Sequence, residues 1–290
     1  MLGSEPTWNQ SGLLVAGKTS GAAGSASDTF KNSACVYVDA NYTLYVCDHH
    51  NERVQKWFQN ATVGITIAGA SAGTAVGHVE YLTMDKQGYI YVAGHTLSKV
   101  LRFAPGSIVG TVAAGSVNGQ LKESSDVAID DDLNLYVADP KNKRIMKWTQ
   151  NSTSGTAIIT HNDLDGIYGI LLVPNSTNQI YLSSKNKDAI YLWTFGGSSA
   201  DLTLTTVNST NQPTLKDPLG MALDNNGSLY VADKDNNRIV MFPAGSTIGE
   251  PILGECNVEP LITAPMDVAI DNNQNLYVVL DGNQVLKYTK

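Results

Sequence analysis

The sequence has little cysteine, no long hydrophobic run and no cluster of basic residues. Three cysteines among 290 residues cannot build the dense disulfide framework of a small secreted protein, and at least one of them lacks an intrachain partner. Apolar runs such as residues 170–173 are far too short to cross a bilayer, and the amino terminus lacks the hydrophobic segment of a secretion signal. We expect a soluble chain, or a piece of a longer protein, without membrane insertion.

Positive charge is also scarce. The chain has 19 Lys and Arg against 27 Asp and Glu, which gives a formal net charge of −8. Phosphate backbones and anionic lipids attract clustered Lys and Arg, so this balance disfavours both kinds of partner. We therefore expect no nucleic acid partner.

A repeat dominates what the sequence does contain. A Leu/Ile-Tyr-Val/Leu core occurs six times, with successive tyrosines 46, 45, 45, 49 and 47 residues apart. This period is close to the length of one four-stranded propeller blade. Alternation along each strand predicts that the tyrosines are buried between blades. They are Tyr45, Tyr91, Tyr136, Tyr181, Tyr230 and Tyr277.

Each repeat has the pattern of four short strands and little that is typical of helix. A period-two run precedes the tyrosine strand and ends, in five repeats, at an Asp followed by turn residues. A third strand follows a polar turn, and a fourth follows a Gly- and Ser-rich gap. The expected blades are approximately 34–69, 79–115, 124–160, 167–207, 218–255, and 265–290 together with 11–17.

The sixth repeat ends after three strands. Residues 12–17 have the fourth-strand pattern, yet they precede the first complete repeat. We expect the N-terminal strand to complete the last blade, which would cover a strand edge and close the ring. The predicted fold is all-β, a single domain over 1–290 that forms a six-bladed β-propeller of four-stranded antiparallel blades.

Three connecting turns share the pattern Asp-x-x-Asn-x-Arg. We expect each Asp to accept hydrogen bonds from the turn amides and each Arg to return a charge-assisted bond, so that the pair staples a hairpin. An exposed ion pair contributes only about 0 to 1 kcal/mol, so its absence from three other blades is tolerable. The pairs are Asp48 with Arg53, Asp139 with Arg144, and Asp233 with Arg238.

The repeats resemble NHL repeats, on motifs such as PLGMALD at 218–224, LYVAD at 229–233 and NNRI at 236–239. The resemblance covers essentially the whole chain and implies a six-bladed propeller. NHL propellers serve as enzymes, RNA readers, sensors and adhesive modules, so the resemblance does not select a function.

Two related six-bladed groups are metal-dependent enzymes. Peptidyl-hydroxyglycine lyases hold zinc with histidines, and gluconolactonase-like hydrolases hold a cation with Asn, Asp and Glu. The resemblance implies that ligands lie at the channel mouth, near the start of each blade's first strand. Only Glu80 is a suitable ligand there, whereas a catalytic zinc takes three protein ligands, so we expect neither chemistry. The six positions are Ala34, Glu80, Ser125, Tyr168, Leu219 and Met266.

Two further carboxylates occupy the next position inward. Asp126 and Asp267 belong to the third and sixth blades, which stand opposite each other in a six-fold ring. Together with Glu80 they would make an acidic channel mouth for calcium, another cation or a basic side chain. Alternatively, they bind channel water or backbone amides. The histidines show no metal-ligand spacing, and we expect His49 and His50, in a connecting turn, to be solvated.

Sequons and cysteines bear on the compartment. Seven Asn-x-Ser/Thr sequons exceed random placement and favour secretion, with an Asn- and Ser-rich loop composition as the competing explanation. In the first hairpin Cys35 opposes Cys47, which is compatible with a disulfide or with two buried thiols; Cys256 is either free or joined to another chain. The sequons are at Asn9, Asn41, Asn60, Asn151, Asn175, Asn208 and Asn226.

Together these features predict a non-catalytic recognition or scaffold propeller that needs no cofactor. Its end surfaces, made of loops, suit a protein or glycan partner, and we expect it to be extracellular or secreted. The alternative is a metal-dependent lyase or hydrolase that uses an atypical channel site.

Overall fold

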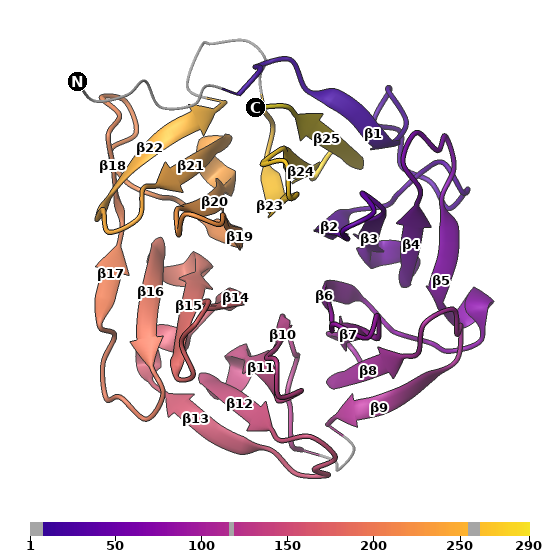
Figure 1. Ribbon diagram of the computed structural model, residues 1–290, viewed down its shortest axis with the longest axis horizontal. Helices are drawn as coiled ribbons and strands as arrows, with labels where there is room; N and C mark the ends of the chain where they lie inside the picture. Colours follow the sequence, from indigo (N-terminus) through magenta and orange to yellow (C-terminus); the bar gives the residue numbers. More distant parts are fainter. Residues whose placement is uncertain (1–7, 116–118, 255–261) are drawn as a thin grey trace.

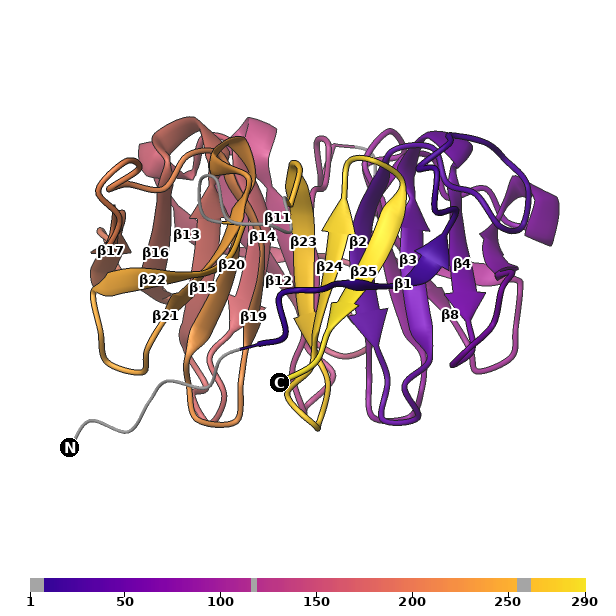
Figure 2. The ribbon, with the colours of Figure 1, turned by 90° about the horizontal axis from the view of Figure 1, so that it is seen from above.

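The computed structural model describes residues 8–115, 119–254 and 262–290, which form a six-bladed β-propeller (Figure 1). Seen from the side in Figure 2, the blades form a disc with connecting turns on both faces. The described residues contain strands and short 3-10 turns, without an α-helix, and so no helix among them could span a membrane. The predicted all-β propeller is confirmed.

Each blade is a meander that starts beside the central axis and ends at the rim. The first blade has β2 (Ser33–Val38), β3 (Leu44–Asp48), β4 (Arg53–Trp57) and β5 (Ile65–Gly69), and the second has β6 (Val79–Met84), β7 (Ile90–Gly94), β8 (Lys99–Phe103) and β9 (Gly110–Ala114). The third has β10 (Val127–Ile129), β11 (Leu135–Asp139), β12 (Arg144–Trp148) and β13 (Thr156–Thr160).

The remaining blades follow the same order. The fourth has β14 (Ile167–Leu172), β15 (Gln179–Ser184), β16 (Ala189–Thr194) and β17 (Leu202–Leu204), and the fifth has β19 (Pro218–Leu223), β20 (Leu229–Asp233), β21 (Arg238–Phe242) and β22 (Ile248–Leu253). The sixth has β23 (Pro265–Ile270), β24 (Leu276–Leu280) and β25 (Gln284–Tyr288), completed by β1 (Leu13–Gly17).

One boundary differs from the prediction. The sequence pattern assigned 167–207 to the fourth blade, but β18 (Thr206–Val207) pairs in parallel with β22 of the fifth blade. The chain that leaves the fourth blade runs along the open edge of β22, where unpaired backbone groups are available for hydrogen bonding. Residues 206–207 therefore cover an edge of the next sheet.

The ring closes through the N-terminal strand, as predicted. Strand β1 pairs antiparallel with β25, so the two ends of the chain share the sixth sheet (Figure 1). Trp8 adds a hydrophobic anchor: it is 3% exposed, packs edge-on against Tyr230 with ring centroids 5.6 Å apart, and donates Nε1–H to the carbonyl of Gln274 at 3.1 Å. Closure thus combines strand pairing with burial of an aromatic ring.

In several blades, a glycine near the start of the outer strand packs beneath the aromatic ring of the third strand. A Cβ atom on Gly12 would lie 2.8 Å from the ring of Tyr288, closer than real side chains pack. The same close approach occurs in four other blades, and this shared geometry explains why a segment from the other end of the chain fits the sixth blade. Those pairs are Gly64 with Trp57, Gly110 with Phe103, Gly155 with Trp148, and Gly249 with Phe242.

Five of the six repeat tyrosines are buried, as predicted, and have a polar function as well, whereas Tyr181 is only partly buried. In five blades the ring is buried and the hydroxyl donates to an Asp at the end of the first strand, at 2.9 to 3.4 Å. The other oxygen of each Asp accepts backbone N–H groups of the turn, so the motif fixes the hairpin to the core. The pairs are Asp39 with Tyr45, Asp85 with Tyr91, Asp130 with Tyr136, Asp224 with Tyr230, and Asp271 with Tyr277.

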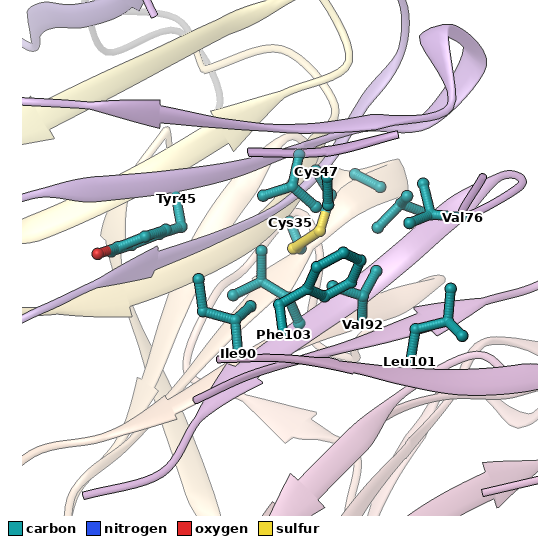
Figure 3. Packing of buried hydrophobic residues seen from close by; sticks show 13 residues of the cluster. Cys35, Tyr45, Cys47, Val76, Ile90, Val92, Leu101 and Phe103 are labelled. Atoms are coloured by element: carbon teal, nitrogen blue, oxygen red, sulfur yellow. A yellow bond between two sulfur atoms is a disulfide. The ribbon is translucent and has the colours of Figure 1, made fainter. Parts of the chain in front are cut away.

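The core between the first two blades contains a disulfide. Cys35 and Cys47 are joined and fully buried, among side chains that include Val92 and Phe103 (Figure 3). The pairing follows the strand register, in which the adjacent Val36 opposes Val46. Of the two arrangements compatible with the sequence, the structure contains the disulfide. Cys256 lies outside the described residues.

The Asp–Arg staples form, but their surroundings differ from the prediction. The Asp233–Arg238 pair is 2.7 Å apart with both side chains 0% exposed, so the expectation of a weak, exposed pair was wrong here. The Asp accepts the backbone N–H of Lys216, from the segment entering the blade, instead of a turn amide. Arg238 donates to two carbonyls of the same segment. The staple therefore ties the turn to the entry loop.

The other two staples repeat this arrangement. Arg53 and Arg144 bind Asp48 and Asp139 at 2.6 and 2.8 Å, and both carboxylates are 0% exposed. Each Asp again accepts a backbone N–H seventeen residues earlier in the chain. Both arginines also donate to entry-loop carbonyls, so the three staples share a buried carboxylate and a link to the entry loop, although the Arg144 side chain is 25% exposed.

Candidate ligand site at the channel mouth

The starts of the six first strands converge at one end of the channel. Five of the six predicted mouth positions, all except Ser125, line a cavity of about 180 Å³ together with His49 and Lys185. An adjoining cavity of about 340 Å³ contains Ser125. The two cavities share Glu80, Tyr168 and Lys185, so these three side chains lie where the hollows meet.

Glu80 is held between two histidines. Its Oε1 lies 3.1 Å from Nε2 of His49 and 4.0 Å from Nδ1 of His95, and its side chain is 17% exposed. Burial alone would raise the pKa of this carboxyl, but the hydrogen bond and charge of His49, with the charges of His95 and Lys185, hold the pKa below its ordinary value. Glu80 is therefore an anion at neutral pH.

A chain of acidic and basic side chains extends from Glu80 to the next blade. His95 Nε2 lies 3.8 Å from Oε2 of Glu123, and the same oxygen lies 3.3 Å from Nζ of Lys141. Carboxylates and basic side chains alternate along this path, so like charges are not placed side by side. Together with His49 of the first blade, the network spans three blades at the channel mouth.

The histidines gather more closely than the sequence predicted. The ring of His49 packs at a tilt against those of His50 and His78, with centroids 4.7 and 4.6 Å apart. The expectation of a solvated side chain was wrong for His49, which is 12% exposed, whereas His50 is exposed. Burial, then the charges of His49 and His78, lower the pKa of His50. His78 joins the cluster from the segment that enters the second blade, so local spacing could not reveal the contact between its ring and that of His49.

Tyr168 and Lys185 complete the mouth. Tyr168 is 7% exposed, and its pKa is well above the ordinary value because of burial and then the nearby carboxylate of Glu80. Lys185 is exposed and forms no ion pair among the described residues. A fixed anion, a buried hydroxyl and a free cation are thus presented together to a ligand.

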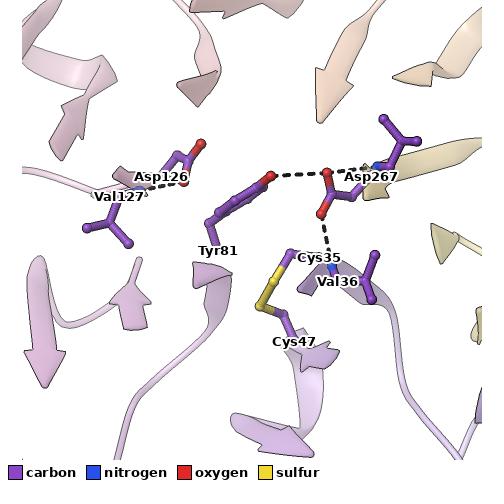
Figure 4. The surroundings of a disulfide bond; sticks show 8 residues. Cys35, Val36, Cys47, Tyr81, Asp126, Val127 and Asp267 are labelled. Carbon is purple, nitrogen blue, oxygen red and sulfur yellow. Dashed lines mark hydrogen bonds between the residues drawn. A yellow bond between two sulfur atoms is a disulfide. The ribbon is translucent and has the colours of Figure 1, made fainter. Parts of the chain in front are cut away.

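The two predicted channel aspartates have a different environment. Asp267 accepts the backbone N–H of Val36 in the first blade and of Val268 in its own blade, each at 2.9 Å, and the hydroxyl of Tyr81 at 3.2 Å (Figure 4). Asp126 likewise accepts the N–H of Ile170 in the fourth blade at 2.6 Å. Each carboxylate therefore links its blade to the next. Of the two alternatives from the sequence, a cation site or binding to channel water or backbone amides, the structure agrees with binding to backbone amides.

Burial controls the acidity of this pair. Both aspartates are 0% exposed, and burial raises the pKa of Asp267 to about 7 and that of Asp126 well above its ordinary value. Figure 4 shows Tyr81 between them. Gly220 of the fifth blade makes room for this arrangement, because a Cβ there would collide with the Asp267 carboxylate.

These positions do not combine into a metal-ligand set. Glu80 lines the mouth cavities, whereas Asp126 and Asp267 are buried and bound to amides. Within the described ranges, no group of three or more His, Cys, Asp or Glu side chains is arranged to hold a metal ion. The predicted acidic mouth is therefore reduced to one carboxylate, paired with His49.

The seven predicted glycosylation sites are all accessible. Every sequon asparagine is exposed, and Asn60, Asn151 and Asn175 occupy left-handed turn positions. Exposure of the asparagine is a requirement for glycan attachment, and all seven positions meet it. The modification itself remains a prediction.

Comparisons with known proteins agree with the fold. Residues 215–242 match the NHL repeat. No curated protein sequence is significantly similar to this chain. A gluconolactonase from Xanthomonas campestris has a similar structure, with a TM-score of 0.72 and 14% identity over 90% of this chain and 87% of its own.

Two further solved structures are similar. A Bacteroides thetaiotaomicron protein of unknown function has a TM-score of 0.74 and 18% identity, covering 97% of this chain and 76% of its own. Virginiamycin B lyase from Staphylococcus aureus has a TM-score of 0.63 and 11% identity, covering 91% and 97%. At such low identity these similarities establish the fold and leave the function open.

Proposed function

We propose that this propeller is a non-catalytic recognition module that binds a protein or glycan partner at its channel-mouth face. The observation that carries the proposal is the meeting of two cavities at Glu80, Tyr168 and Lys185. All six blades contribute residues to these cavities, so the mouth offers a broad surface of fixed, mixed charge. Such a surface suits hydrogen-bonded and ionic contacts with a polar partner.

The chemistry of the channel supports recognition over catalysis. A catalytic zinc takes three protein ligands and keeps an open position. Here Glu80 is engaged by His49, and both channel aspartates are committed to backbone amides. The histidine, carboxylate and tyrosine groups at the mouth therefore do not fit the cation that the enzyme groups require.

A metal-dependent lyase or hydrolase is the second candidate. It is favoured by the fold similarity to a gluconolactonase and to virginiamycin B lyase, and by the position of Glu80 at the channel mouth. An enzyme of this kind would need an atypical site, because only one mouth position carries a carboxylate.

An extracellular location also forms part of the proposal. Seven exposed sequons and one disulfide are compatible with an oxidising compartment. Expression through a secretory pathway, followed by peptide mass spectrometry, tests it: we expect glycans at several of the seven asparagines. Complete absence of glycans would count against this location.

An activity assay and a binding screen together test the recognition function. We expect no hydrolysis of lactones, with or without added divalent cations, and we expect a partner from a panel of extracellular proteins and glycans. Binding should weaken in Glu80→Gln and Lys185→Ala but not in Lys86→Ala, which changes an exposed residue on the opposite face. Lactone turnover that disappears in Glu80→Gln would support the enzyme instead.

A further inference from the structure

A second hollow lies between the third and fourth blades, on the face opposite the channel mouth. This groove has a volume of about 450 Å³. Its walls are the β10–β11 turn with Asp132, the β14–β15 turn with Asn175 and Thr177, and the rings of Tyr136 and Phe195. Because the first strands begin at the channel mouth, the turns at their far ends place the groove on the other face. It is therefore separate from the site described above.

The groove exists because the fourth blade departs from the repeat. Its first hairpin encloses residues 173–179 between the paired Leu172 and Ile180, whereas the third blade encloses only 130–134 between Ile129 and Leu135. The longer turn also lacks the Asp that binds the repeat tyrosine in the other five blades. The other five blades connect their first two strands with the shorter turn, so the propeller fold does not require the longer turn of the fourth blade.

Phe195 gives the groove a fixed aromatic wall. Its ring stacks on Tyr136 of the third blade, with centroids 5.4 Å apart and planes inclined by 28°. Tyr136 is itself anchored, because its hydroxyl donates to Asp130 at 2.9 Å. The backbone N–H of Phe195 donates to Asn178 of the long turn at 2.8 Å. The partly exposed ring of Phe195 is thus held rigidly at the groove.

Polar side chains with free hydrogen-bonding capacity surround this ring. Asp132, Asn175 and Thr177 line the groove and make no side-chain hydrogen bond within the described part of the chain. The carboxylate of Asp132 can accept hydrogen bonds, and the amide of Asn175 and the hydroxyl of Thr177 can both donate and accept them. Lys147, whose Nζ lies 5.1 Å from the Tyr136 ring centroid, offsets part of the acidic charge.

We propose that this groove binds a neutral saccharide. A rigid aromatic face packs against the apolar face of a sugar ring, while amide, hydroxyl and carboxylate groups at its edge bind the sugar hydroxyls. The volume lies within the range of roughly 300 to 1,000 Å³ that is typical of small-ligand sites. Lys147 already covers the Tyr136 ring, which disfavours a cationic ligand there. The proposal is independent of what binds at the channel mouth.

The sequon at Asn175 makes the protein source important for the test, because a glycan attached to this groove residue would obstruct it. The chain should therefore come from a host without N-glycosylation that still forms disulfides. Calorimetry with maltotriose, cellotriose, xylotriose and chitotriose, each to millimolar concentration, then measures binding directly. We expect at least one of them to bind.

Matched variants locate the binding. Phe195→Ala should weaken it roughly tenfold, which corresponds to about 1.4 kcal/mol. Phe58→Ala removes an aromatic ring that is 51% exposed after the third strand of the first blade, and it should have no effect. Asn175→Ala keeps the aromatic wall and should also weaken binding. This second variant keeps the proposal testable if Phe195→Ala unfolds the fourth blade.

Four results would overturn the proposal, three from the saccharide titrations and one from a peptide. None of the four saccharides binds; Phe58→Ala weakens binding as much as Phe195→Ala; or Glu80→Gln abolishes binding while Phe195→Ala leaves it intact. The last result would place saccharide recognition at the channel mouth. A basic peptide that binds in the groove in place of every saccharide would also refute it.

Discussion

Arg238 provides a sharp test of the buried staples, because its guanidinium and its partner are both 0% exposed. Arg238→Ala removes the 2.7 Å contact to Asp233 and the bonds to the carbonyls of Gln212 and Thr214. Removing one partner of a buried ion pair typically costs about 3 to 5 kcal/mol, because the other charge is left uncompensated. We expect a loss of this order in the free energy of unfolding.

The loss should also depend on pH. Burial already raises the pKa of Asp233, against the opposing effects of Asn236, Lys216 and Arg238. Without Arg238 the pKa rises further, so the folded state binds a proton more readily than the unfolded chain does. The penalty is then complete above the folded-state pKa and shrinks as the pH falls toward about 3.9, the ordinary value of an Asp. The variant should therefore lose less stability at pH 5 than at pH 7.

Urea unfolding followed by tryptophan fluorescence measures this effect at both pH values. The matched control is Lys86→Ala, which breaks a 2.8 Å pair with Asp131 whose side chains are 75% and 80% exposed. The control should change stability by no more than about 1 kcal/mol. If Arg238→Ala costs no more than Lys86→Ala at pH 7, burial does not strengthen the staple and the reasoning is refuted.

Three further predictions follow from the channel and the ring closure. Burial raises the pKa of Asp267 to about 7. Its contribution to stability should therefore fall as the pH rises from about 4 to 7, by at most about 4 kcal/mol. In Asp267→Asn this pH dependence should be weaker, as measured by the midpoints of urea unfolding at pH 5 and 8. Gly220→Ala should lower the melting temperature by several degrees through collision with Asp267, whereas Gly282→Ala, with open space around it, should not. Deletion of residues 1–17 should lower the melting temperature or cause aggregation, and an unchanged melting curve would contradict the closure by β1.

Much of the fold was predictable from the sequence because it depends on local patterns that repeat. The spacing of the six tyrosines and the fourth-strand pattern of residues 12–17 predicted the blades and the ring closure. The burial of Arg238 was not predictable, because it depends on an entry loop more than twenty residues away. The bond from five of the six repeat tyrosines to an Asp was visible as a constant six-residue spacing, but the Asp was interpreted only as the start of a turn.

The candidate site was predictable only in part. Glu80 was identified from its position at the start of a first strand, and the structure places it at the mouth. Its contacts with His49 and His95 come from turns of two blades, so they depend on how the sheets pack around the ring. The groove beside Phe195 had one local indication in the sequence, the missing Asp of the fourth repeat.

Metal binding by the purified protein tests the central claim, recognition without catalysis at Glu80, most directly. Calorimetric titration with calcium and zinc, combined with elemental analysis, should give no stoichiometric metal and no thermal stabilisation at millimolar concentration. One bound ion per chain, lost in Glu80→Gln and accompanied by turnover of a lactone, would contradict the account.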